Sequence, residues 1–153
     1  MQLNSQIQAT ANSTLYDTDL SAWAAHNAGL LRAKKFSDLD AEHLIEELDD
    51  MDKSEFRAFE GHLQNLMSYL LKWQLQPLIR SGSWRGTIEN ARHSTAKFLR
   101  DNSSFIARLQ QTITDEYLYA RRSASYDAGL QLDAFPLTCA YSAEQLFDET
   151  WFS

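Results

Sequence analysis

The stretch LIEELDDMDKSEFRAFEGHLQNLMSYLLKWQLQP, residues 44–77, decides the fold of this chain. Its apolar residues recur with the spacing of an α-helix, which places them on one face. The pattern is longer than that of most globular helices. Pro77 ends it, because a proline pushes the preceding residue out of the helical conformation. We therefore predict one long amphipathic helix that starts after Asp40, its N-cap, and runs to about Gln76.

Shorter helical patterns lie on both sides of this helix, and each starts at a residue that can cap free backbone amides. The expected starts are Asp17 or Thr18, Ser83, Asn102–Ser103, and Ser142 with Gln145 in a capping box, while Gly129 ends the third pattern. No segment shows the alternation of an exposed strand. The predicted fold class is all-α, a helical bundle of four main helices plus a short C-terminal helix.

The length of 153 residues suits one domain with a sizeable core. Residues 1–14 are polar and lack helical periodicity, so we expect a flexible N-terminal tail there. A single helical domain is then expected over residues 15–153.

The cellular location follows from what the sequence lacks. No apolar run reaches the roughly 18 residues of a membrane span, and the N-terminus has neither the basic nor the apolar region of a signal peptide. The single cysteine, Cys139, cannot form an intramolecular disulfide or a multi-cysteine metal site. We expect a cytoplasmic protein that does not bind membranes.

Charge is segregated along the chain. Residues 1–70 hold twelve acidic and five basic residues, residues 71–125 hold nine basic and four acidic ones, and residues 126–153 hold five acidic and no basic ones. Such asymmetry can mark a surface for a partner. It also arises when oppositely charged helices lie beside one another in a fold. The sequence leaves both interpretations open.

The turn LLKWQLQPLIRSGSWRGTI, residues 70–88, concentrates tryptophan, arginine and the first proline. In one interpretation the tryptophans close the core at one end of the bundle, and the arginines cap carbonyls at the end of the preceding helix or pair with acids. In the other, the same side chains line a binding groove. The candidate binding residues are Trp73, Gln76, Arg80, Ser83, Trp84, Arg85 and Arg92.

Three irregular motifs carry a family resemblance. They are LLKWQLQP (70–77), RSGSWRGTIENAR (80–92) and FPLTCAYSAEQLFDETWF (135–152). In this order they closely resemble the bacterial domain-of-unknown-function family 29, and the likeness covers residues 15–153. The resemblance implies an all-helical bacterial protein without a known activity. The chain departs from the family pattern at Tyr69, where histidine is usual, and at Ala140, where proline is usual.

Patterns for catalysis are scarce. No glutamate has a histidine three positions later, which excludes the helical di-metal enzymes. We predict no catalytic residue, no metal ligand and no cofactor. The acidic run Glu46–Asp52 could hold a divalent cation through its carboxylates or form a solvated face. Arg57 and His62 form R-x4-H, which resembles the motif of the helical nucleotide-binding ribonucleases, where arginine would stabilise charge and histidine would move a proton.

Long amphipathic helices and segregated charge favour a non-enzymatic helical adaptor or regulatory module that binds another protein. The partner could be a second copy of the chain, which would give a homodimer. One alternative is a metal-independent ribonuclease that uses Arg57 and His62. Another is a nucleic-acid-binding module built on the basic and aromatic residues of 71–125, against which the pI of about 5.0 argues.

Overall fold

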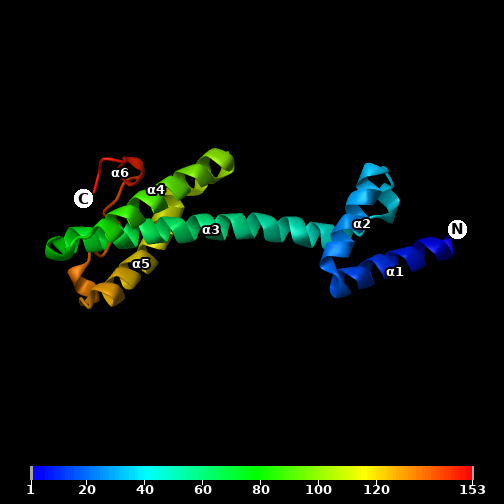
Figure 1. Cartoon of the computed structure of the whole chain (residues 1–153), viewed down its shortest axis with the longest axis horizontal. Coiled ribbons are helices and arrows are strands. Elements are labelled where there is room, and N and C mark those ends of the chain that lie inside the picture. Colours follow the sequence, from blue (N-terminus) through cyan, green and yellow to red (C-terminus); the bar gives the residue numbers. More distant parts are fainter. Residues whose placement is uncertain (1, 153) are drawn as a thin grey trace. The chain divides into compact units, whose positions relative to one another are not determined.

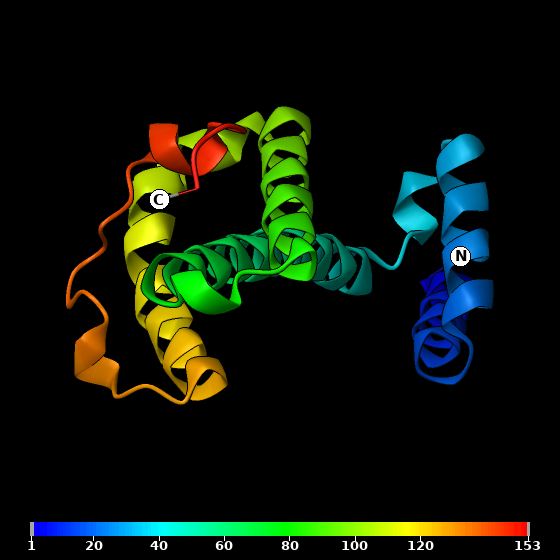
Figure 2. The same ribbon diagram turned by 60° about the vertical axis from the view of Figure 1, so that its left-hand side comes forward.

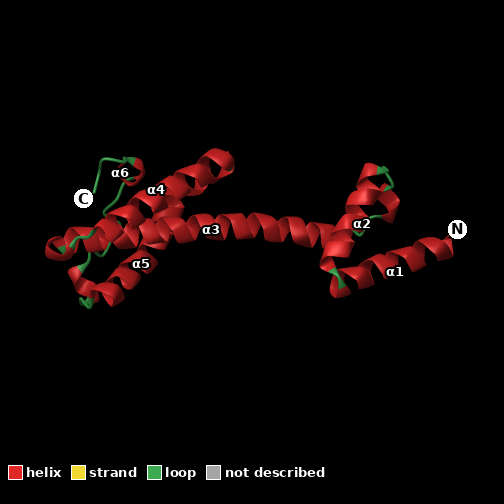
Figure 3. Ribbon diagram, in the orientation of Figure 1, coloured by secondary structure: helices red, strands yellow, loops and turns green. Residues whose placement is uncertain are grey.

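The structure is a computed structural model that describes residues 2–152. In this part of the chain it consists of helices and the loops between them (Figure 3), which confirms the all-α prediction. The helices, labelled in Figure 1, are α1 (Gln2–Thr18), α2 (Leu20–Arg32), α3 (Ala41–Leu75), α4 (Gly82–Asp101), α5 (Leu109–Ala128) and the short α6 (Ala143–Phe147). Four short 3-10 segments lie between them, at Phe36–Asp38, Pro77–Ile79, Ser103–Arg108 and Leu132–Ala134. None of the described helices combines the length and apolarity needed to cross a membrane.

Several predicted helix boundaries are confirmed. The carbonyl of Asp40 accepts the first hydrogen bond of α3 from the Leu44 amide at 3.0 Å, and α3 ends before Pro77. Gly129 follows α5 with φ 64°, a left-handed conformation that glycine adopts without strain. At α6, Ser142 and Gln145 form both hydrogen bonds of the predicted capping box.

The N-terminal part of the chain differs from the prediction. Residues 2–18 form helix α1, where the sequence predicted no helix, so the described residues form five main helices, one more than the four predicted. Helix α2 begins at Leu20, and its cap is Asp19, whose carboxylate accepts from the Ala22 amide at 2.9 Å. Asp17 and Thr18, the predicted caps, instead belong to the last turn of α1.

Contacts divide the chain into two compact units, residues 1–53 and residues 54–153. Helix α3 contributes its first part to one unit and its second part to the other. Compactness of contacts does not measure whether a segment folds alone. The domain boundaries expected from the sequence, a flexible tail over 1–14 and a single domain over 15–153, therefore stay predictions.

The second unit has a continuous apolar core. Helices α4 and α5 pack against the second part of α3 (Figures 1 and 2). Fully buried side chains from all three helices form this core, namely Phe59, Leu63, Leu66, Met67, Leu70, Leu71, Ile88, Ile113 and Tyr117. At the end of α4, Phe105 meets Phe56 edge-on with ring centroids 5.0 Å apart. This unit is therefore stabilised mainly by apolar burial.

The first unit has a small and mostly polar interior. Among its described side chains, only Asn12, Trp23 and Asn27 are buried. The Asn27 Oδ1 atom accepts from the Asp40 amide at 3.1 Å and from Asn12 Nδ2 at 3.2 Å. Its Nδ2 atom donates to Asn12 Oδ1 and to the Trp23 carbonyl, both at 2.9 Å. One asparagine of α2 thus ties together α1, α2 and the start of α3.

Replacing this asparagine should loosen the first unit alone. In Asn27→Leu the side chain keeps a similar volume, but the Asp40 amide and the Asn12 amide group lose their buried partner. Each buried polar group left unpaired costs about 1–3 kcal/mol. Hydrogen exchange of the full chain should show that loss of protection in α1 and α2, with α4 and α5 unchanged. Equal protection in wild type and Asn27→Leu would contradict this account, and Asn90→Leu, at an exposed site on α4, is the matched control.

Candidate functional site

The predicted binding residues differ in exposure: Arg80, Ser83 and Arg85 are exposed, Trp73, Gln76 and Trp84 are half-buried, and Arg92 is buried. Ser81, not the predicted Ser83, caps α4, because its Oγ atom accepts from the Trp84 amide at 3.2 Å. Ser83 lies exposed in the first turn, and its carbonyl accepts from Thr87 Oγ1 at 3.0 Å. The sequence could not separate two serines that stand only two positions apart.

Arg80 and Trp73 contact each other across the turn. Arg80 Nε donates to the Trp73 carbonyl at 2.8 Å, which satisfies a carbonyl that the end of α3 leaves free. The guanidinium carbon of Arg80 also lies 4.9 Å from the centroid of the Trp73 ring. On its other side, the Trp73 ring lies 5.5 Å from the Phe152 ring. The expectation that an arginine caps the preceding helix is confirmed for Arg80.

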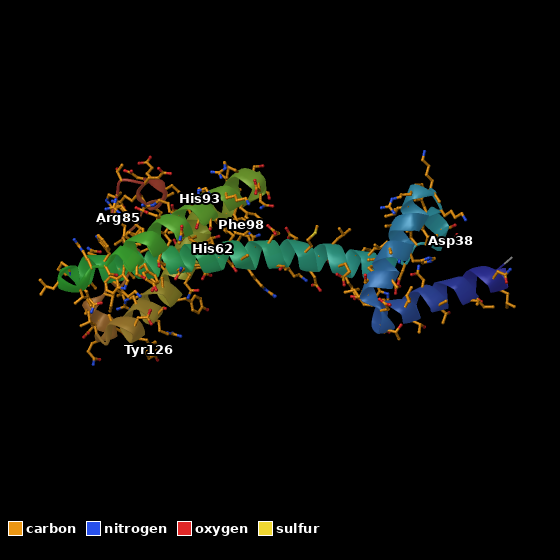
Figure 4. The ribbon with its side chains drawn as sticks, in the orientation of Figure 1. Asp38, His62, Arg85, His93, Phe98 and Tyr126 are labelled. Carbon is orange, nitrogen blue, oxygen red and sulfur yellow. The ribbon has the colours of Figure 1, made fainter. Side chains whose placement is uncertain are left out.

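Arg92 is buried, with 3% of its surface exposed, and it binds the C-terminal segment. Its Nε atom donates to the Leu146 carbonyl at 2.6 Å and its Nη2 atom to the Trp151 carbonyl at 2.8 Å. Its guanidinium carbon lies 5.4 Å from the Phe152 ring centroid, and that of Arg85 lies 5.1 Å from the same centroid. Figure 4 shows Arg85 close to this end of the chain. Burial lowers the pKa of Arg92, although nearby carboxylates oppose the shift.

Lys72 is a buried cation that sequence reasoning missed. It is 4% exposed, and its Nζ atom binds Asp127 Oδ2 at 3.1 Å, which joins α3 to α5. The same Nζ lies 3.6 Å from the Tyr69 ring centroid and 5.3 Å from that of Trp84. A lysine inside the apolar run LLKW was the available signal, because a buried lysine needs a partner.

The predicted residues therefore make many contacts within the second unit. Gln76 Nε2 donates to the Ala128 carbonyl at 3.5 Å. Arg85 pairs with Glu89, four residues later on α4, at 2.9 Å. A partner could reach Arg92 only by displacing the C-terminal segment. That these seven residues bind another molecule stays a prediction.

A second polar cluster lies in the first unit, where α1, α2 and α3 meet. Asp40 Oδ2 accepts from Trp23 Nε1 at 3.0 Å and contacts His43 Nδ1 at 2.6 Å. The His43 ring stacks on the Tyr16 ring with centroids 3.9 Å apart. Tyr16 donates its hydroxyl to Glu47 Oε1 at 2.8 Å. These contacts fix the first turns of α3 against α1 and α2.

The pKa values in this cluster respond to these contacts. The hydrogen bond to Glu47 raises the pKa of Tyr16 to about 12. Burial alone would raise the pKa of Asp40, but hydrogen bonds from His43 and Trp23 lower it below its ordinary value. The hydrogen bond to Asp40 raises the pKa of His43, against a smaller opposite effect of burial. The pair is therefore most stable with His43 protonated and Asp40 ionised.

An uncovered apolar row lies on the first part of α3. Ile45, Leu48 and Met51 are 59%, 60% and 61% exposed, although the sequence pattern placed Ile45 and Leu48 on the core face. Residues three apart are neighbours on a helix surface, so these three side chains form one ridge, which we call the apolar row. Six acidic residues lie between and beside these three along the chain, namely Glu42, Glu46, Glu47, Asp49, Asp50 and Asp52. Across residues 2–152, no group of three or more potential ligands is placed to hold a metal ion.

The residues of the enzymatic alternative are not joined. His62 packs beside Phe98, with ring centroids 5.6 Å apart (Figure 4), and it borders a groove of about 460 Å³ with Ser68 and Ser123. Within the described chain no hydrogen bond links it to Arg57, which is exposed. Burial raises the pKa of Cys139, so its thiol stays protonated near neutral pH.

The comparisons with known proteins give one match. A family model described as "Domain of unknown function DUF29" matches residues 15–152. No curated protein and no solved structure matches the chain.

Arg92→Met should release the C-terminal segment, because methionine keeps much of the stem and removes the two donors. Hydrogen bonds from charged groups contribute about 1.5–3 kcal/mol, so opening of the segment should rise by about 10- to 100-fold. Chymotrypsin cleavage after Trp151 should accelerate by that factor, while cleavage at other sites should keep its wild-type rate. Arg100→Met, at an exposed site on the same helix, should cleave like wild type. An equal effect of both changes would contradict the role of Arg92.

The first unit should also lose stability at alkaline pH. The folded pKa of His43 is raised, so its contribution is complete below about pH 6.5 and is lost as pH rises through the folded value. Asp40 acts in the other direction, because its lowered pKa gives stability that is present above about pH 4 and lost in acid. Protection of the Trp23 indole N–H, followed by NMR and corrected for the intrinsic rise of exchange with pH, should fall as pH rises above about 6.5. His43→Gln should flatten this dependence, and an unchanged pH profile in that variant would refute the assignment.

Proposed function

The chain belongs to the DUF29 family, and we propose that it is a non-enzymatic helical module that binds another protein through the apolar row of α3. The observation that carries the proposal is the exposure of Ile45, Leu48 and Met51 on consecutive turns of one helix. Single exposed apolar side chains are normal in soluble proteins, but a contiguous set is typical of an interaction surface.

The energy available at this surface suits a protein partner. Complete burial of a leucine, isoleucine or methionine side chain stabilises by about 1.5–3 kcal/mol. Three such side chains provide a core for an interface, and Leu44, half-buried beside them, extends it. Charged and polar residues around an apolar centre are the usual arrangement of a protein interface.

The contacts of Asp40 and Glu47, in the same turns of α3 as the apolar row, favour a rigid docking surface. The hydrogen bonds of Asp40 and Glu47 hold the same helical turns against α1 and α2. A surface held in its binding conformation loses less conformational entropy when a partner docks. The polar cluster is thus a support for the row in this proposal, and it needs no catalytic role.

Two other functions remain separable by experiment. If Arg57 and His62 cleave RNA, His62→Ala should abolish cleavage, and protein capture should be unaffected. If the basic residues bind nucleic acid, Arg80→Ala or Arg85→Ala should weaken a binding that falls steeply with salt. Neither alternative predicts an effect of substitutions in the apolar row.

Capture from an extract of the source cells tests the proposal. The tagged full chain serves as bait after nuclease treatment, and bound proteins are identified by mass spectrometry. The double variant Leu48→Ser, Met51→Ser should retain at least tenfold less of a stoichiometric partner, because each tenfold loss corresponds to about 1.4 kcal/mol. Circular dichroism should show an unchanged helical fold, since both side chains are exposed.

A matched control excludes a general effect of surface apolarity. Leu118 on α5 is 59% exposed, almost the same as Leu48, and Leu118→Ser should retain the partner like wild type. Retention of the same partner by the double variant would refute the apolar row as the binding surface, and so would an eluate that holds only the bait.

A further inference from the structure

We propose that the partner presents a basic amphipathic helix, whose apolar face packs on the apolar row and whose Lys and Arg side chains pair with the acidic residues beside it. This inference rests on the proposed function and adds the chemistry of the partner. It is carried by the charge and the shape of the first turns of α3.

Uncompensated negative charge borders the row. Between Ala41 and Asp52 the chain has six acidic residues and no lysine or arginine. Asp49 and Glu42 lie about 40° and 60° around the helix from Ile45, and Asp52 lies about 40° from Leu48, so these three carboxylates border the Ile45 side of the row. All three are exposed, and none forms an ion pair with a residue of the described chain.

The nearest cation does little to neutralise this edge. Lys53 lies 3.9 Å from Asp50, and the two side chains are 61% and 73% exposed. Ion pairs that exposed contribute little and are screened by salt. His43, the other cationic group of these turns, already contacts Asp40. Like charges four residues apart destabilise a helix, and a cationic partner would remove that repulsion.

The shape of the surface favours a helix over a strand as the partner's binding element. The backbone of α3 is hydrogen-bonded internally, so it offers no free edge for strand addition. The row is a ridge of side chains at three-residue steps, and such a ridge fits the groove between side chains of a second helix. A matching helix has apolar residues at three- and four-residue steps and basic residues on the flanking positions.

The same charge argues against other occupants of this surface. In a homodimer formed through the row, the acidic edge of one copy would face either the acidic edge of the other copy or its apolar side chains. Neither arrangement would neutralise the carboxylates. Nucleic acid and anionic lipid headgroups carry the same sign as Glu42, Asp49 and Asp52. Complementary potentials favour a correct partner, and juxtaposed like charges exclude wrong ones.

Binding of a defined peptide tests the inference. The probe is a fluorescent peptide of leucine and lysine, about 18 residues or five turns long, with leucine on one helical face. A second peptide has the same composition in a shuffled order that removes the face. Fluorescence anisotropy with the full-length protein should give binding of the first peptide that is at least tenfold tighter than that of the second. Equal binding of the two peptides would overturn the inference.

Two sets of variants locate the binding. The rim variant removes the three charges that border the row, with Glu42→Gln, Asp49→Asn and Asp52→Asn. Its control carries Asp101→Asn, Asp133→Asn and Glu144→Gln, three exposed sites in the second unit with the same change in net charge. The rim variant should bind the amphipathic peptide at least tenfold more weakly and with a smaller dependence on salt between about 50 and 300 mM. At the higher salt, where the effect of net charge is screened, the control variant should bind the peptide within about twofold of wild type. Equal weakening in both variants would reveal only general attraction to an acidic protein and would overturn the inference.

Failure of this inference is distinct from failure of the proposed function. If Leu48→Ser, Met51→Ser loses the cellular partner while the rim variant retains it, the row binds a protein that lacks basic character. If the double variant keeps both the peptide and the cellular partner, neither the inference nor the proposed binding surface stands.

Discussion

The apolar face of α3 is longer than the part of it that the described chain covers, and this constraint governs the rest of the structure. The sequence keeps apolar residues at helical spacing from Leu44 to Leu71. Burial begins only at Phe56, where α4 and α5 supply the opposing side chains. Ile45, Leu48 and Met51 remain in water. An exposed apolar ridge is a cost for an isolated chain and a source of affinity when a partner covers it.

Different forces stabilise the interior of each of the two units. Residues 54–153 bury a contiguous set of leucine, isoleucine and aromatic side chains, which is the usual source of stability in a domain. Residues 1–53 bury Trp23 and a hydrogen-bonded pair of asparagines among the side chains described there. A polar interior of this kind depends on complete pairing, because a buried group without a partner is costly. The first unit is therefore the part whose opening should respond most to pH and to single polar substitutions.

The sequence predicted the elements whose signals are local. The end of α3 at Pro77, the left-handed Gly129 and the capping box at Ser142 each depend on residues only a few positions apart. Helix α1 was missed because Gln, Asn, Ser and Thr dominate its sequence and give no apolar stripe. Its attachment depends on Asn12, which reaches Asn27 fifteen residues later. No local pattern encodes that pairing.

The candidate sites show the same limit. The resemblance of residues 15–153 to the DUF29 family was confirmed over 15–152, but the family brings no activity with it. Arg92 was predicted as a candidate binding residue. The sequence did not show that it is buried, because its partners are the backbone carbonyls of Leu146 and Trp151, which sequence patterns do not reveal. Ile45 and Leu48 looked like core residues, because periodicity shows which face of a helix is apolar and not whether another element covers it.

The exposure of Leu48 is the central claim, and cysteine labelling tests it most directly. Leu48→Cys is made in a Cys139→Ser background and compared with Leu118→Cys and Leu66→Cys, which represent an exposed and a fully buried site. Maleimide should modify Leu48→Cys at nearly the rate of Leu118→Cys in the free protein. A rate as slow as that of Leu66→Cys would mean that the chain itself covers the apolar row, and would contradict the account.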